Sequence, residues 1–272
     1  MSHNGRISPE SAGNYFKYTR GVFDAHCHLE QDVSEGQQIA DRCRSAGMRG
    51  LITVCARSPD LDNAVRISRQ NPGFVYYTAG LHPLEAAGLT EIEISDYAKR
   101  IQALPDSNAP NHPIAIGEIG LDYVLVREKE KVLHSRKVFG EFVSLAKSLK
   151  LPISIHCREA YRDVIDILKS GAKQDVVFHY FNQPEYLREI IDNGWVVSLP
   201  LTLSKSKIKA VFESADLGNV MLETDSPAEL GSRKVTPMNV GELVESISKV
   251  TMIPEKEIIE KTTKTVSGFF RI

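Results

Sequence analysis

Short apolar segments alternate with longer stretches of helical periodicity along this chain, and eight such pairs follow one another. The segments predicted as strands are residues 21–24, 50–54, 74–78, 113–116, 152–155, 176–178, 195–198 and 220–222. The segments predicted as helices are residues 35–46, 61–70, 91–104, 129–149, 160–169, 185–193, 205–213 and 239–250, with a further amphipathic helix at 254–269. This alternation favours a parallel sheet with helices on its outside.

Eight strand–helix units in 272 residues predict one α/β domain, a TIM-like (β/α)8 barrel over residues 21–272 with an extra C-terminal helix. Residues 1–20 are polar and are expected to form an N-terminal extension. An open, doubly wound sheet is the alternative architecture. No GxGxxG or GxxxxGK pattern follows the first predicted strand, so we expect no nucleotide cofactor.

The composition is that of an ordinary globular protein, with 42% hydrophobic and 25% charged residues. A formal net charge of -2 gives no overall attraction to nucleic acid or to an anionic membrane, so any contact with a polyanion must be local. No apolar run approaches the roughly 20 residues of a membrane helix, and the N-terminus lacks a signal-peptide core. The four cysteines show no CxxC spacing, and we expect a cytoplasmic protein with reduced thiols and no membrane partner.

The first predicted strand leads into the sequence FDAHCH, which contains His26 and His28. Residues two apart in an extended chain point to the same side, so these imidazoles share one face. At the C-terminal end of a barrel strand, that face is the one on which active sites form. The pair is typical of a metal site, although two hydrogen-bonded histidines in a loop remain the alternative.

Other potential metal ligands follow other predicted strands in the same way. Each of them alone could be a buried polar residue, or a helix cap in the case of the aspartate. These residues are Glu118 after the fourth strand, His156 after the fifth, His179 after the sixth and Asp225 after the eighth. A ring of imidazoles and carboxylates in a barrel mouth is costly unless cations neutralise it, so the pattern predicts a metal centre.

Six donors are more than one catalytic ion with an open coordination position requires, which favours two divalent ions. Glu118 is expected to bridge them, and Asp225 to bind one ion and orient or deprotonate the attacking water, so both are predicted catalytic residues. A donor set of nitrogen and oxygen without thiolate fits Zn, Mn or Mg and does not choose among them.

These residues lie in segments that resemble the TatD family of metal-dependent deoxyribonucleases, a branch of the amidohydrolase-related barrel hydrolases. The matching segments are FDAHCHL (23–29), GLHP (80–83), GEIGLDY (117–123), LPISIHCREA (151–160), FHYF (178–181) and LETDSP (222–227). They span nearly the whole chain in the family's order. The resemblance places the family's metal ligands on the same six residues and implies DNA as substrate, cleaved at phosphodiester bonds.

The resemblance also implies roles for three further residues. His82 would contact a substrate phosphate, and capping of a turn before Pro83 is the alternative. Arg158 would reach a phosphate oxygen, or else form a surface ion pair with Glu159 or Asp163. Asp122 is expected to support the site through hydrogen bonds without binding metal.

Three segments around the predicted mouth depart from the family pattern: residues 124–125, 180–183 and 227–237. They leave the metal ligands intact and leave the identity of the substrate open. DNA cleaved from an end is the leading hypothesis, with a local positive rim from Arg158, Lys205, Lys207, Lys209, Arg233 and Lys234. Hydrolysis of a small ester, lactone, amide or phosphoester is the second, and a barrel that binds without turnover is the third. The sequence gives no indication of oligomeric state.

Overall fold

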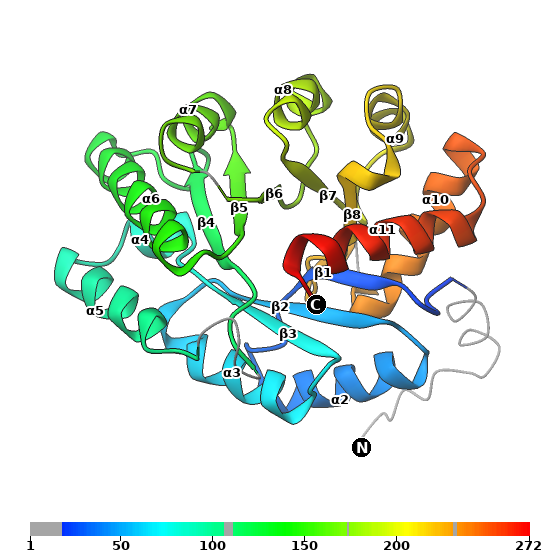
Figure 1. The fold of residues 1–272 in the computed structure, drawn as a ribbon, viewed down its shortest axis with the longest axis horizontal. Coiled ribbons are helices and arrows are strands. Elements are labelled where there is room, and N and C mark those ends of the chain that lie inside the picture. Colours follow the sequence, from blue (N-terminus) through cyan, green and yellow to red (C-terminus); the bar gives the residue numbers. More distant parts are fainter. Residues whose placement is uncertain (1–17, 106–110, 173, 231–232) are drawn as a thin grey trace, which may run out of the picture.

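A computed structural model describes residues 18–105, 111–172, 174–230 and 233–272 (Figure 1). Its main sheet has eight parallel strands in the order of the chain, which confirms the predicted barrel. The strands are β1 (Phe23–Cys27), β2 (Gly50–Cys55), β3 (Val75–Ala79), β4 (Ile116–Asp122), β5 (Ile153–Arg158), β6 (Val176–Phe178), β7 (Val196–Pro200) and β8 (Val220–Glu223). Most of the predicted N-terminal extension, residues 1–17, lies outside the described part.

Helices surround the strands. They are α2 (Val33–Ser45), α3 (Leu61–Gln70), α4 (Pro83–Ala86), α5 (Glu91–Gln102), α6 (Lys129–Leu149), α7 (Tyr161–Gly171), α8 (Leu187–Asp192), α9 (Lys205–Phe212), α10 (Val240–Thr251) and α11 (Glu255–Phe270). Local sequence starts several of them: Asp32 caps α2 by accepting from the Ser34 and Glu35 amides, and Thr90 forms a capping box with Glu93 at α5.

The barrel closes where β8 meets β1. The Asp225 amide donates to the His26 carbonyl at 2.9 Å, and the His28 amide donates to the Ser226 carbonyl at 2.6 Å. Inside this seam the buried Asp24 carboxylate accepts from the amide and hydroxyl of Thr224. The seam therefore lies beside the histidines of the first strand and fixes Asp225 next to them.

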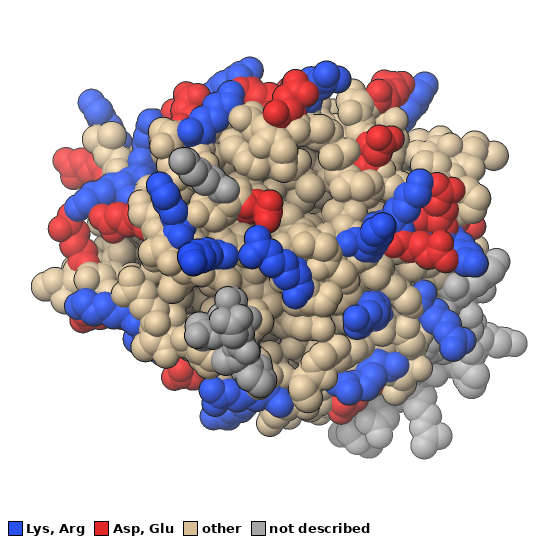
Figure 2. Space-filling model, viewed as in Figure 1, with Lys and Arg blue, Asp and Glu red and all other residues tan. Residues whose placement is uncertain are grey.

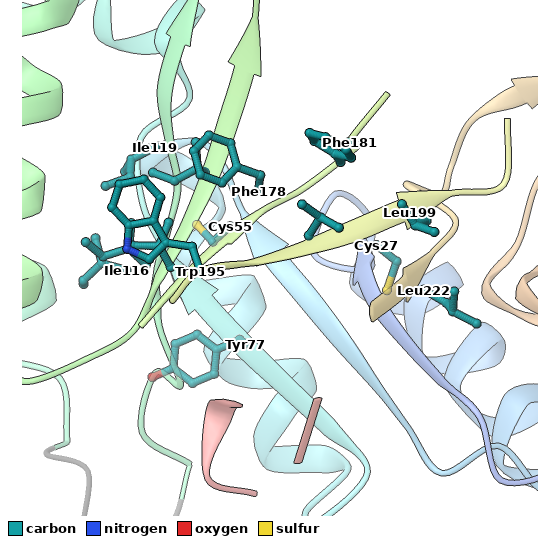
Figure 3. Close-up of a cluster of buried hydrophobic side chains, with 14 of the residues drawn as sticks. Cys27, Cys55, Tyr77, Ile116, Ile119, Phe178, Phe181, Trp195, Leu199 and Leu222 are labelled. Atoms are coloured by element: carbon teal, nitrogen blue, oxygen red, sulfur yellow. The ribbon is translucent and has the colours of Figure 1, made fainter. Parts of the chain in front are cut away.

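Hydrophobic side chains form two cores. The larger lies between strands and helices and includes Tyr77, Phe178 and Trp195 (Figure 3). The smaller fills the barrel interior with residues from the beginnings of the strands, such as Phe23 and Met221. Each core takes alternate residues of the same strands, as expected for a barrel packed on both faces.

Helix α11 covers the N-terminal end of the barrel. Val266 and Phe270 of this helix belong to the inner core and contact the layer that contains Phe23, Ile114 and Met221. In Figure 1 the helix crosses in front of the strands, so this view faces the end of the barrel that α11 closes. The predicted C-terminal helix thus seals the barrel at the end opposite the C-terminal strand ends.

The predicted element boundaries agree to within about two residues except at three strands. The first and fifth strands were expected at residues 21–24 and 152–155, and both β1 and β5 continue three residues further. The fourth strand differs most. We expected residues 113–116, whereas β4 begins at Ile116 and continues to Asp122. Pairing with β5 extends through Asp122 and Arg158, and this register carries the strand past the charged Glu118. The prediction was wrong because a buried carboxylate looked like the end of an apolar strand. The short helix α4 and the β9 (Glu229–Leu230) and β10 (Arg233–Lys234) hairpin were not predicted.

The face that carries α11 is rich in Lys and Arg toward its middle, while most of its Asp and Glu lie nearer the edge (Figure 2). On this face the charged side chains are therefore unevenly distributed. In the described ranges, no helix has both the length and the apolar character needed to cross a bilayer.

Candidate metal centre

The two histidines of the first strand face the aspartate that follows β8. His26 is buried within β1, and His28 follows directly. Their Nε2 atoms lie 3.6 and 3.4 Å from Oδ1 of Asp225. The shared orientation predicted from two-residue spacing is thus present, and the β8–β1 seam supplies the carboxylate opposite. Residues 226–230, which the structure describes, form no helix, so Asp225 does not cap one.

Glu118 lies at the centre of the cluster, with histidines near both of its carboxylate oxygens. Its Oε1 is 2.6 Å from Nδ1 of His156 and 2.9 Å from Nε2 of His179. Its Oε2 is 3.6 Å from Nε2 of His26. Although burial would raise the pKa of this carboxyl, the surrounding histidines lower it well below its usual range. An ionised carboxylate between two groups of imidazoles has the arrangement of a bridging ligand.

Carboxylates lie behind three of the histidines, near their other ring nitrogens. Oδ2 of Asp122 is 3.0 Å from Nε2 of His156, and Oδ1 of Asp122 accepts from two backbone amides at 2.8 Å. Asp122 therefore lies behind His156 and contacts the ring nitrogen that faces away from Glu118. Such contacts fix the tautomer and orientation of an imidazole.

Two further supporting carboxylates, Glu30 and Glu223, were missed by the sequence analysis. Oε1 of Glu30 lies 3.1 Å from Nδ1 of His28, and Oε1 of Glu223 lies 3.4 Å from Nδ1 of His179. Both glutamates are buried. A signal did exist, because each stands two residues from a predicted ligand, which is the spacing that shares a face of an extended chain.

Burial alone would lower the pKa of His28 and of His179, but their carboxylate partners raise both well above the usual value. For His28 the main opposing charge is Glu30, and for His179 it is Glu118 followed by Glu223. The cluster is therefore strongly negative when its histidines are neutral. A site of this charge attracts cations, either protons or metal ions.

Unpartnered buried atoms test whether a metal fits here. Both ring nitrogens of His26 are buried without a hydrogen-bond partner, as is Oε2 of Glu223. Buried polar atoms are normally satisfied, so these are suited to an ion. Three groups have ligand atoms close enough to share one: His26, His28 and Glu118; His82, Glu118 and His156; and His26, His179 and Glu223. The donors present thus fit divalent cations.

His82 and Arg158 lie at the same mouth. His82 is the N-cap of α4, where its Nδ1 accepts from the Leu84 amide at 3.1 Å, as the capping alternative expects. Its Nε2 nevertheless lies 3.9 Å from Oε1 of Glu118, and burial lowers its pKa to about 4. Neutral His82 with Nδ1 accepting presents an Nε2 hydrogen to the cluster. Arg158 at the end of β5 is exposed and forms no ion pair with Glu159 or Asp163.

The cluster opens into a cavity of about 730 Å³, whose walls include His28, His82, Glu118, Arg158, His179 and Asp225. A wider depression of about 1090 Å³ lies at the other end of the barrel, beside α9 and α11, and is lined by none of the predicted metal ligands or phosphate contacts. Lys209, expected on the positive rim of the mouth, lines this depression instead. Of the expected positive rim, Arg233 is paired with Glu242 and Lys234 with Glu35, so neither is free to attract an anion.

Comparison with known proteins assigns this chain to a family. Residues 23–271 match the family described as TatD related DNase. The chain belongs to the TatD-related DNase family. All six predicted donors of this TatD-family protein lie within the matched region. The resemblance found from the sequence is thereby confirmed.

Its relatives cover most of both chains. The putative deoxyribonuclease tatdn3 of Danio rerio is 30% identical, across 92% of this chain and 97% of the relative. The deoxyribonuclease TATDN3 of Homo sapiens is 29% identical, across 92% and 94%. The 3'-5' ssDNA/RNA exonuclease TatD of Pantoea vagans is 30% identical, across 76% and 79%. These relatives are named for hydrolysis of nucleic acids.

A solved structure shares the fold. The crystal structure of YJJV, a TatD homolog from Escherichia coli, superposes with a TM-score of 0.78 at 19% identity, covering 93% of this chain and 98% of that one. At this identity the likeness concerns the fold alone. It supports the barrel of this TatD-family chain independently of its sequence motifs.

Proposed function

We propose that this TatD-family protein hydrolyses phosphodiester bonds in DNA with the help of two divalent metal ions. The observation that carries the proposal is the position of Glu118, whose two carboxylate oxygens face different histidines. The names of the relatives support nucleic acid as the substrate class. Zn, Mn and Mg all suit a donor set of nitrogen and oxygen.

Each residue of the cluster has a role in this proposal. His26, His28 and Asp225 would hold one ion, His156 and His179 the other, and Glu118 both. When bound, such ions supply Lewis acidity and acidify a water molecule. Asp122, Glu30 and Glu223 orient the imidazoles from behind, and His82 and Arg158 would donate hydrogen bonds to the substrate phosphate.

Asp225 is suited to receiving the proton of the attacking water. Burial would raise its pKa, but His28 and the neighbouring histidines lower it, so the carboxylate is ionised near neutral pH. Its side chain keeps 28% of its surface exposed toward the mouth. A charged acceptor that is partly exposed can both hold the water and take its proton.

The shape of the site favours cleavage near a strand end. The donors lie inside the mouth of a barrel that α11 closes at its other end. A frayed or single strand can reach such a site more easily than the interior of a duplex.

All four cysteines are free thiols, which supports a location in the reducing environment of the cytoplasm.

The test is release of nucleotides from single-stranded and duplex DNA with added Mg, Mn or Zn, beside a panel of small phosphodiesters and lactones. Glu118→Ala and Asp225→Ala should each abolish turnover while the barrel stays folded. Glu141→Ala, on the exposed surface of α6, is the matched control and should keep full activity. DNA that stays inert with every metal while a lactone is hydrolysed would replace this proposal with the second hypothesis.

A further inference from the structure

Arg57 lies in the wall of the active-site cavity and belongs to neither the metal cluster nor the predicted substrate contacts. It follows β2 and precedes the short 3-10 helix η1 (Ser58–Asp60). Its side chain is 59% exposed, whereas that of its partner Asp60 is only 11% exposed. A buried carboxylate thus holds an arginine whose outer part faces the cavity.

The contact with Asp60 fixes the guanidinium in a defined orientation. Nε of Arg57 donates to Oδ2 of Asp60 at 2.7 Å, and Nη2 donates to Oδ1 at 3.3 Å. A guanidinium carries five N–H groups in one plane, so three remain for another acceptor. Because Asp60 already holds the plane, little conformational entropy is lost when those groups bind a ligand.

Backbone geometry places Arg57 next to a residue that reaches the metal cluster. The His82 amide donates to the carbonyl of Ala56 at 2.8 Å, which joins the start of α4 to the residue before Arg57. Nε2 of His82 in turn lies 3.9 Å from Glu118. Moving outward from the cluster, the polar groups along this wall are therefore Glu118, His82 and Arg57.

We propose that Arg57 forms a binding site for a second phosphate of the substrate, next to the phosphodiester that is cleaved. The inference rests on the proposed nuclease function and specifies it, because a strand carries phosphates at regular intervals and a small ester or lactone does not. Planar paired donors match two oxygens of a phosphate. Asp60 and Glu85 also line this wall, so recognition here depends on directed hydrogen bonds more than on net charge.

The competing explanation is that Arg57 only stabilises η1 through its ion pair with Asp60. Asp60 is nearly buried, so removing Arg57 would leave its carboxylate without this partner and would cost stability. The two explanations differ in one measurable respect: a structural arginine affects every substrate alike, whereas a phosphate contact affects only substrates that carry the second phosphate.

The experiment uses deoxydinucleotides with a single cleavable phosphodiester, made without a terminal phosphate, with a 5′-phosphate or with a 3′-phosphate. For Arg57→Ala we expect KM to rise about 10- to 100-fold for one of the two phosphorylated forms, the range expected for loss of a charge-assisted hydrogen bond. KM for the unphosphorylated form and kcat for all three should stay within about 2-fold, since this form lacks the partner of Arg57. Arg57→Lys should restore only part of the loss, because an ammonium lacks the planar donors.

Arg100→Ala is the matched control. Arg100 donates to the Ser58 carbonyl and to Asp62 beside the same short helix, and it does not line the cavity. It should leave all three KM values unchanged. Equal changes for all three dinucleotides with Arg57→Ala, or no change for any, would overturn the phosphate site and leave the nuclease function standing. No turnover of any dinucleotide by the unmodified chain would overturn both.

Discussion

Glu223 is buried behind His179 and makes contacts on only one side. Its Oε1 accepts from the Tyr180 amide at 2.7 Å and lies 3.4 Å from Nδ1 of His179, while Oε2 has no partner. The negative charge of Glu223 therefore acts on Nδ1 of His179. The position of Nδ1 sets the orientation of the imidazole ring, and this orientation determines how Nε2 faces Glu118.

We predict that Glu223→Gln weakens metal binding about 10- to 100-fold, the usual effect of removing a carboxylate behind a histidine ligand. Calorimetric titration of the metal-free protein with Zn or Mn gives the affinity directly. Glu242→Gln changes a carboxylate that pairs with Arg233 outside the cluster, and it should leave the affinity unchanged. An unaltered affinity in Glu223→Gln would remove Glu223 from the site.

Asp24 has a different electrostatic situation in the β8–β1 seam. Burial raises its pKa to about 8, even though Thr224 donates two hydrogen bonds that lower it. The folded chain therefore keeps this proton to a higher pH than the unfolded chain, whose carboxyl loses it near 3.8. The contribution of Asp24 to the free energy of unfolding is therefore complete below pH 3.8 and declines as the pH rises to about 8.

Asp24→Asn should remove that decline, so the free energy of unfolding should fall less between pH 5 and pH 8 in the variant than in the parent. Urea unfolding of chelator-treated protein at several pH values measures both slopes. Asp96→Asn, which changes an exposed aspartate beside Lys99, should keep the parent's slope. Parallel curves for Asp24→Asn and the parent would show that Asp24 stays ionised in the folded state.

At the scale of single residues, the donors could be proposed from the sequence because each follows an apolar run of a predicted strand, and barrel strands end at one face. His26 and Asp225 illustrate this, since they are 3.6 Å apart although they lie at opposite ends of the chain. Three of the donors, His26, Glu118 and His156, lie within β1, β4 and β5 and not after them. Glu30 and Glu223 were missed although each stands two residues from a predicted ligand, because this spacing does not settle which carboxylate turns toward which imidazole. Arg57 was missed because its importance follows from the Asp60 contact, which no motif records.

At the scale of an element, strand β4 was likewise predictable from the sequence only in part. Its existence and order were predicted, but its course past Glu118 depends on pairing with β5. That pairing brings the backbones very close at Gly120, where φ is +146° and an added Cβ would lie 1.9 Å from the His156 carbonyl oxygen. Only glycine fits such an approach.

Gly120→Ala is expected to destabilise the protein by about 3 kcal/mol or more, through the clash and the strained backbone together. Gly140→Ala is the control, since Gly140 lies within α6 and a Cβ there meets nothing within 4 Å. That change should stabilise by about 0.5–1 kcal/mol, the helical preference for alanine. Thermal unfolding of both variants measures the contrast, and equal effects would contradict the described register of β4 and β5.

The whole molecule depends on α11 to complete its inner core. Phe270→Ala should cost about 3–5 kcal/mol, because it leaves a cavity beneath the barrel where the helix packs. Lys264→Ala, an exposed change on the same helix, should stay within about 0.5 kcal/mol. Denaturant unfolding compares the two. A small effect of Phe270→Ala would mean that the barrel is stable without its terminal helix.

The position of α11 has a consequence for how the protein is made. This helix follows all eight strands in the chain, yet its Val266 and Phe270 complete a layer that begins with Phe23 of the first strand. During synthesis, apolar side chains of the incomplete barrel interior stay exposed to solvent until the ribosome has released nearly all the residues that cover them. The nascent polypeptide thus exposes apolar side chains for a long interval, during which it is prone to aggregate.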